Sequence, residues 1–180
     1  MRYFRAFAAA FLAGVVLVQA NAGELKLPAG WRLPTQAELA EDSVRNDSPT
    51  KFATAFADLN GDGIEDQAYI LMSTKFSGEA LWVYQSDGKS DFSWIKLGEI
   101  KWGKEYSNVP PAMGIAIVKP GVVAYACFDE AKDCDFGDRA SRPKLKLRDP
   151  ALLYFKLESA ASMYFWSKSQ NRFLKVWLSD

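Results

Sequence analysis

Residues 52–73 read FATAFADLNGDGIEDQAYILMS, and this stretch decides the fold that we expect for the chain. Residues 52–57 alternate larger side chains with alanine, as a strand with two different faces does. Residues 67–73 form a short apolar run that is typical of a buried strand. A polar loop with two glycines separates these runs. The stretch therefore predicts a strand, a tight loop and a second strand.

The loop at residues 58–66 carries oxygen-bearing side chains at alternate positions. Ca²⁺ takes about six to eight oxygen ligands, and a coiled loop can direct several of its side chains at one point. Gly61 and Gly63 supply the backbone freedom that such a coil needs. The sequence therefore predicts a Ca²⁺ site, with a metal-free polar turn as the alternative. The expected ligands are Asp58, Asn60, Asp62, Asp66 and, through its backbone carbonyl, Ile64.

This loop resembles the Asp-x-Asp/Asn-Gly-Asp-Gly-x-x-Asp loop of the FG-GAP and VCBS-type repeats of integrin-like β-propellers. The resemblance covers about residues 52–73 only, and it implies that the same five residues hold a structural Ca²⁺ between two strands. An EF-hand would need flanking helices and an acidic residue at the twelfth loop position, where this chain has Tyr69. A propeller needs about four or more blades, whereas the sequence has one copy of the loop. We therefore expect one family-like unit within a small β domain.

The N-terminus has the pattern of a secretory signal peptide. Arg2 and Arg5 precede an apolar run at residues 6–18, and Ala20-Asn21-Ala22 fits the small-residue cleavage pattern. Residues 1–22 are therefore expected to be a signal peptide, and the protein is expected to be periplasmic or secreted. Without Arg2 and Arg5, the 22 basic residues become 20 against 22 acidic ones, so no basic surface for nucleic acid is expected.

Cys127 and Cys134 are the two cysteines of the chain. In an exported protein this even count favours a disulfide over two free thiols. Six residues separate the two cysteines, which differs from the two residues of a redox C-x-x-C motif. The bridge is expected to hold an acidic loop that contacts a partner. The loop's acidic residues are Asp129, Glu130 and Asp133.

The rest of the chain predicts a mainly antiparallel β domain with one short N-terminal helix. Thr35 and Glu38 form a capping-box pattern for a helix that extends to about Val44. The sheet is expected to be a sandwich or a partial propeller-like sheet within residues 51–180, preceded by an extended arm and the helix at residues 23–50. Further strands are expected at residues 80–85, 92–97, 115–119, 122–128, 144–147, 152–157, 162–166 and 173–178.

The chain has no histidine, which excludes Ser-His-Asp and Cys-His catalysis and most catalytic zinc sites. We therefore expect an exported, non-enzymatic protein-binding module. Its more specific form is a periplasmic inhibitor or immunity protein against a cell-wall-targeting toxin. One alternative is a carboxylate-based hydrolase. Another is a glycan-binding module that uses the C-terminal aromatic residues Tyr164, Phe165, Trp166, Phe173 and Trp177.

Overall fold

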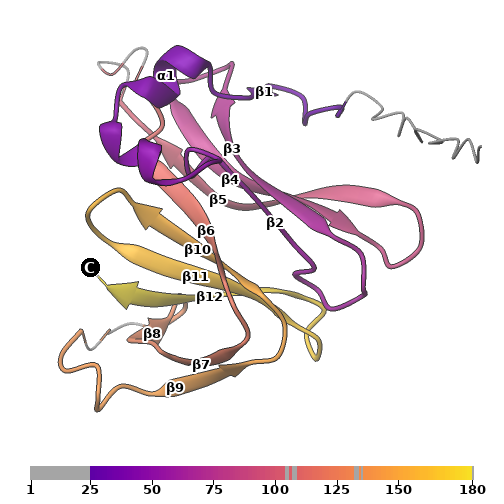
Figure 1. Cartoon of the computed structure of the whole chain (residues 1–180), viewed down its shortest axis with the longest axis vertical. Helices are drawn as coiled ribbons and strands as arrows, with labels where there is room; N and C mark the ends of the chain where they lie inside the picture. The colour runs from indigo at the N-terminus through magenta and orange to yellow at the C-terminus, as the bar shows by residue number, and fades with distance from the viewer. Residues whose placement is uncertain (1–24, 104–105, 107–108, 132–133, 135, 180) are drawn as a thin grey trace, which may run out of the picture.

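The computed structural model describes residues 25–103, 106, 109–131, 134 and 136–179 (Figure 1). The signal peptide expected at residues 1–22 lies outside this range. The described chain is mainly β, as predicted, and consists of two five-stranded antiparallel sheets and a two-stranded one. The first sheet contains β1 (Trp31–Arg32), β2 (Thr54–Ala57), β3 (Asp66–Ser73), β4 (Gly78–Ser86) and β5 (Phe92–Lys101). The second sheet contains β6 (Met113–Val118), β8 (Cys127–Phe128), β10 (Ala151–Lys156), β11 (Ala161–Ser167) and β12 (Arg172–Ser179). The two-stranded sheet pairs β7 (Gly121–Ala124) with β9 (Lys144–Leu147).

The first sheet has the order β1-β3-β4-β5, and β2 pairs with the same edge of β3 as β1 does. Strand β5 is therefore an edge strand. Its pairing with β4 shifts by one residue, because Leu81 lies opposite Gly98 and Trp82 lies opposite Lys96. The extra residue, Leu97, forms a β-bulge on this edge.

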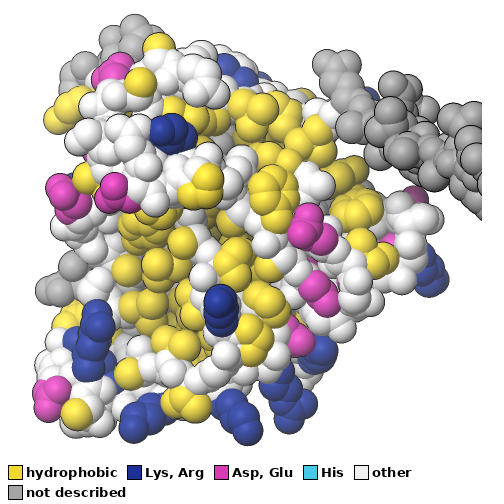
Figure 2. All heavy atoms as spheres, viewed as in Figure 1, with side chains coloured by type: hydrophobic (Ala, Val, Ile, Leu, Met, Phe, Trp, Pro, Cys, Tyr) yellow, Lys and Arg dark blue, Asp and Glu magenta, His cyan; other side chains and the backbone are white. Residues whose placement is uncertain are grey.

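The two large sheets lie face to face across one hydrophobic core, as in a β-sandwich. The inward residues of β3 and β4 alternate with outward ones, so the core takes every second residue of these strands. Figure 2 shows hydrophobic side chains gathered between the two sheets, with Lys and Arg along the lower edge, where β9 lies. The centre of the core consists of Ala68, Ile70, Leu81, Val83, Ile115 and Leu152, none of which is more than 1% exposed.

The opposite face of the second sheet is covered by β7 and β9. A second cluster there joins Leu147 of β9 to Met163 and Val176 of the second sheet. Met163 and Val176 have no exposed surface. The two-stranded sheet thus forms a partial third layer.

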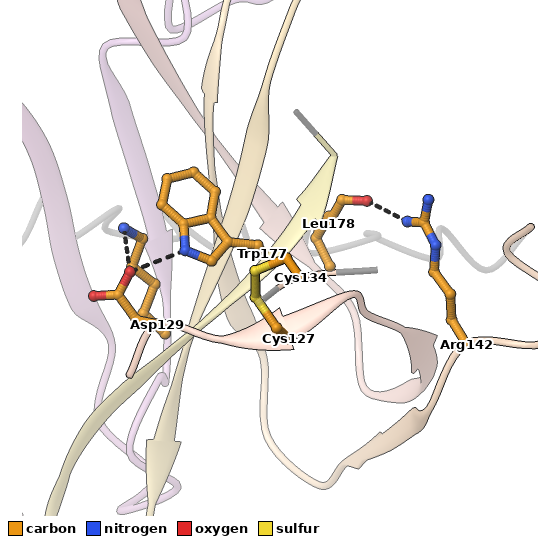
Figure 3. Close-up of a disulfide and its surroundings, with 7 residues drawn as sticks. Cys127, Asp129, Cys134, Arg142, Trp177 and Leu178 are labelled. Atoms are coloured by element: carbon orange, nitrogen blue, oxygen red, sulfur yellow. Dashed lines mark hydrogen bonds and ion pairs between the residues drawn. A yellow bond between two sulfur atoms is a disulfide. The ribbon is translucent and has the colours of Figure 1, made fainter. Parts of the chain in front are cut away.

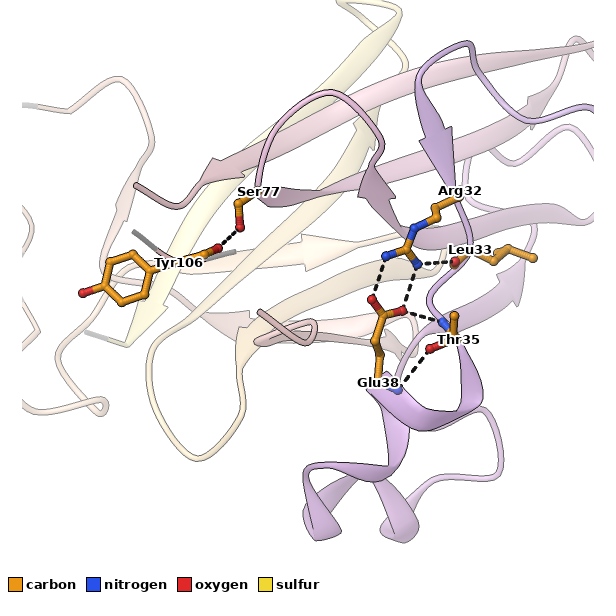
Figure 4. A network of polar contacts seen from close by, with 6 residues as sticks. All are labelled: Arg32, Leu33, Thr35, Glu38, Ser77 and Tyr106. Carbon is orange, nitrogen blue, oxygen red and sulfur yellow. Dashed lines mark hydrogen bonds and ion pairs between the residues drawn. The ribbon is translucent and has the colours of Figure 1, made fainter. Parts of the chain in front are cut away.

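The N-terminal helix α1 (Gln36–Ala40) begins as the sequence predicts. The Thr35 side chain accepts the Glu38 N–H at 3.2 Å, and the Thr35 N–H donates to Glu38 Oε2 at 2.6 Å (Figure 4). Glu38 also accepts two hydrogen bonds from Arg32, at 2.6 and 2.8 Å. The helix ends at Ala40, earlier than predicted, and a separate 3₁₀ helix, η1 (Ser43–Asp47), follows with Asp42 as its N-cap.

One strand prediction is wrong in its extent. Residues 122–128 were expected as a single strand. They form β7 and β8, which belong to different sheets. Tyr125 N–H donates to Pro143 O and Ala126 N–H donates to Trp177 O, so the chain changes sheets at these residues. Strand β6 pairs with β10, and β7 pairs with β9. The local pattern of a strand does not specify such partners.

Candidate functional site

The loop at residues 58–66 connects β2 to β3, which lie side by side in the first sheet. Gly61 has φ of +72° and Gly63 has φ of +89°. Both values lie in the left-handed region, where glycine is the residue with the least strain. These glycines allow the loop to coil tightly between the two strands.

Asp58 organises the first half of the loop. Its Oδ1 accepts the N–H groups of Gly61 at 2.7 Å and Asp62 at 3.1 Å, and its Oδ2 accepts the N–H of Gly63 at 2.8 Å. Three successive backbone amides therefore point at one carboxylate. This arrangement holds the coil together from within.

Asn60 and Asp62 connect the loop to the end of β4. The Asn60 amide group donates to Asp62 Oδ2 at 2.8 Å and to the Ser86 carbonyl at 3.0 Å. Asp62 Oδ1 accepts the Ile64 N–H at 2.8 Å. Burial opposes ionisation of Asp62, but hydrogen bonds from Asn60 and Ile64 outweigh it and lower the pKa of this carboxyl below its ordinary value.

Asp66 is fully buried at the start of β3. Its Oδ2 accepts the Leu59 N–H and its Oδ1 accepts the Ser86 N–H, both at 2.8 Å. One carboxylate at the start of β3 thus binds both the beginning of the loop and the end of β4. Burial raises the pKa of Asp66 above its ordinary value in spite of these hydrogen bonds.

The oxygen atoms of the loop are chemically suitable ligands for Ca²⁺, since carboxylate and amide oxygens are hard ligands. Among the described residues, no three acidic, cysteine or histidine side chains gather into a group that could hold a metal ion. The carboxylates are turned toward N–H groups of the loop and of β4. A carboxylate oxygen has two lone pairs. Asp58 Oδ2 and Asp62 Oδ1 each use one lone pair for the N–H that they accept, which leaves the second lone pair for a cation.

The loop also contacts the second sheet, at a point that the sequence did not indicate. A Cβ built on Gly61 would lie 2.5 Å from Lys168 Nζ and 2.6 Å from Asp149 Oδ1. Lys168 and Asp149 form an ion pair of 3.2 Å. The ion pair therefore lies against the Gly61 backbone and links the loop to the β9–β10 and β11–β12 connections.

Cys127 and Cys134 form the predicted disulfide, with Cα atoms 5.1 Å apart (Figure 3). Arg142 lies near the bridge and is 9% exposed. It donates to the carbonyls of Gly137 and Phe136 and, at 2.7 Å, to that of Leu178. The segment after the disulfide is thereby fastened to β12.

The acidic residues expected to contact a partner are folded back onto β12 where they are described. Asp129 accepts from Trp177 Nε1 at 3.0 Å and from Lys175 Nζ at 2.9 Å. Glu130 pairs with Arg172 at 3.5 Å and has a side chain that is 82% exposed. Asp133 lies outside the described residues. The acidic loop thus carries compensated charges at Asp129 and Glu130.

Asp129 and Glu130 line a groove of about 550 Å³ between the two sheets, at the side where β5 faces β12. Ile95 and Leu97 of β5 and Phe173 of β12 contribute half-exposed apolar side chains to it. The facing residues of β3 and β4 are fully buried, so the core is least covered along β5. This groove is the most extended combination of apolar and charged side chains beside the disulfide.

The C-terminal aromatic residues do not form one exposed surface. Tyr164 is buried in the core and Phe173 packs against the same core. Trp166 packs edge-on against Phe173, with ring centroids 5.1 Å apart. The Trp177 indole N–H donates to Asp129 Oδ1. The C-terminal hairpin therefore offers little platform for a glycan.

Two buried charged side chains that the sequence did not reveal lie beside β6. Arg45 and Glu79 both have no exposed surface. Glu79 Oε1 accepts the N–H groups of Ala112 and Met113, each at 3.1 Å, and Arg45 donates to the Met113 carbonyl at 3.0 Å. Burial raises the pKa of Glu79 to about 7, although the charge of Arg45 acts in the opposite direction.

Comparison of the chain with protein-family models, curated proteins and solved structures finds no match. Among the residues that the structure describes, no helix is long and apolar enough to cross a membrane.

Proposed function

We propose that this chain is an exported, non-enzymatic module that binds a protein partner in the groove between β5 and β12. The observation that supports this proposal most strongly is the composition of the groove. Half-exposed Ile95, Leu97 and Phe173 lie beside the ion pairs Asp129–Lys175 and Glu130–Arg172. An apolar centre with a polar rim is the usual anatomy of a protein interface.

The edge strand β5 gives the groove a second means of contact. Strand β5 pairs with β4, and no strand pairs with its other edge among the described residues. Unpaired backbone groups of an edge strand can accept a segment of another protein. The bulge at Leu97 and the charges of Lys96 and Glu99 protect such an edge against indiscriminate pairing. A selective partner suits this combination better than self-aggregation does.

An inhibitor or immunity protein that blocks a cell-wall-targeting toxin is the specific form that we favour. Such a protein needs export, a rigid contact surface and no catalytic group of its own. The expected signal peptide and the absence of histidine suit it, and the Cys127–Cys134 bridge stiffens the wall of the groove.

We assign a structural role to Ca²⁺ in the loop at residues 58–66. Asp58, Asn60, Asp62 and Asp66 and the Ile64 carbonyl would hold the ion, whose charge would complement the three carboxylates of the loop. Because the loop contacts β4 and the Asp149–Lys168 pair, the ion would stabilise the junction of the two sheets. It would take no part in contact with the partner.

Affinity capture with matched variants tests the binding proposal. Phe128 is 37% exposed in the groove, and Val122 is 65% exposed on β7, away from it. We expect the immobilised wild type and Val122→Asp to retain the same periplasmic protein, and Phe128→Asp to lose it. Equal retention by all three proteins, or no retention by the wild type, would contradict the proposal.

A further inference from the structure

The outer face of the first sheet is unusually rich in aromatic residues. In an antiparallel sheet with one face on the core, the other face is normally polar. Here Tyr69 lies opposite Trp82, and Tyr84 lies opposite Trp94, on the side of the sheet that faces away from the core. Tertiary packing inside the sandwich does not account for these rings, since the core uses the alternate residues of the same strands.

Six of the rings form a continuous line across this face. Successive ring centroids are 4.9 to 6.3 Å apart. Each of these residues is partly exposed, so the line presents some apolar surface to solvent. We call this line the aromatic row; in order, it consists of Phe76, Trp31, Trp82, Trp94, Tyr84 and Phe92.

Lysine side chains lie directly over the aromatic row. Lys96 Nζ is 5.7 Å from the ring centroid of Trp31 and 5.8 Å from that of Trp82. Lys101 Nζ is 5.2 Å from the ring centroid of Phe76. Glu99 pairs with Lys96 at 2.5 Å and with Lys101 at 3.1 Å, so one carboxylate is shared by two ammonium groups. The row therefore carries an excess of positive charge.

We propose that the aromatic row binds an acidic polysaccharide, with sugar rings stacked on the aromatic side chains and uronate carboxylates paired with Lys96 and Lys101. Flat apolar sugar faces suit half-exposed rings, and carboxylates complement the uncompensated ammonium charge. A second copy of the same face would bring like charges together, which disfavours self-association through it. This site meets the groove of the proposed function at Lys96, and its aromatic rings do not line that groove.

The N-terminal arm limits where the polysaccharide can lie. The Trp94 indole N–H donates to the Lys26 carbonyl at 2.9 Å, so the arm passes over Trp94 near the middle of the row. The end formed by Phe76, Trp31 and Trp82 is the one over which both lysines lie. We therefore assign the acidic groups of the polysaccharide to this end.

Affinity electrophoresis of the mature protein in gels that contain polygalacturonate tests the proposal. Dextran serves as the neutral polysaccharide and poly-L-glutamate as the acidic polymer without sugar rings. The double variant Lys96→Gln/Lys101→Gln has a matched control in Lys144→Gln/Lys146→Gln, which removes two exposed charges from β9. We expect that polygalacturonate, and neither dextran nor poly-L-glutamate, slows the migration of the wild type. The dissociation constant for polygalacturonate should be about ten-fold higher for Lys96→Gln/Lys101→Gln than for the control variant.

A ring variant tests the aromatic part of the site. Phe76→Ser should weaken binding to polygalacturonate, whereas Phe128→Ser in the groove should leave it unchanged and affect only protein capture. No retardation of the wild type, equal loss in both lysine pairs, or equal affinity for poly-L-glutamate would overturn the proposal. Retardation by dextran that the lysine changes leave unaltered would also overturn it. Melting curves of each variant confirm that the loss is not due to unfolding.

Discussion

Glu79 should make the stability of this protein fall as pH rises. The side chain is fully buried on β4, and its Oε2 has no hydrogen-bond partner in the described structure. Burial raises its pKa from 4.5 to about 7. When folding raises the pKa of a carboxyl, its stabilising contribution is complete below the pKa of the unfolded state. That contribution is lost as the pH rises through the pKa of the folded state. The loss should therefore occur between about pH 4.5 and pH 7.

The expected magnitude follows from the two pKa values. Each pKa unit corresponds to about 1.4 kcal/mol, so a shift from 4.5 to about 7 gives a total of about 3 kcal/mol. Part of this is already lost at pH 5, and about 2.5 kcal/mol should be lost between pH 5 and pH 8. For a domain of this size the melting temperature should fall by about 5 to 10 °C.

Urea denaturation at pH 5 and pH 8 measures this effect. Glu79→Gln keeps the shape of the side chain and cannot ionise, so it should lose about 2.5 kcal/mol less than the wild type over this interval. Glu41→Gln, at an exposed position after α1, is the matched control and should behave as the wild type does. If the wild type and Glu79→Gln lose the same stability between the two pH values, Glu79 is not the responsible group and the reasoning is wrong.

Three further perturbations test the loop and the disulfide region. Replacing both Cys127 and Cys134 by serine should lower the free energy of unfolding by about 2.5 kcal/mol, because the unfolded chain is no longer restricted by an eight-residue closed loop. Urea denaturation measures the change, and an unchanged midpoint would contradict a stabilising role of the disulfide. Gly63→Ala should lower the free energy of unfolding by about 1 kcal/mol, because alanine is strained in the left-handed region. Gly61→Ala should lower it further, because its Cβ would also displace the Asp149–Lys168 ion pair. Arg142→Leu should cost about 2 kcal/mol, since it removes the hydrogen bonds that join the Phe136 and Leu178 carbonyls to one buried guanidinium group. Equal thermal melting of the variant and the wild type would show these contacts to be unimportant.

The start of the helix could be predicted from the sequence because it depends on neighbours in the chain. Thr35 and Glu38 are three residues apart, and their reciprocal hydrogen bonds form within one turn. The end of the helix depends on Asp42, which caps a new 3₁₀ helix, and the sequence pattern did not distinguish this from a continued α-helix. Strand positions were predictable for the same local reason, since alternation appears within five or six residues.

The partners of strands and of charged residues could not be predicted in this way. Asp149 and Lys168 meet the loop at Gly61 although they follow it by 88 and 107 residues in the chain (149 − 61 and 168 − 61). Arg45 and Glu79 are both fully buried and both bind the backbone of Met113, although they are far from it in the chain. The aromatic row has the same origin, because alternation in β4 and β5 separates two sets of residues without showing which set faces the core.

Calcium-dependent melting of the mature protein tests the central claim about the loop most directly. With Ca²⁺ at about ten times a dissociation constant of about 10⁻⁴ to 10⁻³ M, the folded state should gain about 1.4 kcal/mol, provided that the unfolded chain does not bind the ion. This gain should raise the melting temperature of the wild type by about 3 to 5 °C relative to chelator. Asp62→Ala should lose the response, and Glu65→Ala should keep it, since Glu65 is exposed and is not an expected ligand. If the wild type melts at the same temperature with Ca²⁺ and with chelator, the loop is a hydrogen-bonded turn and the claim is wrong.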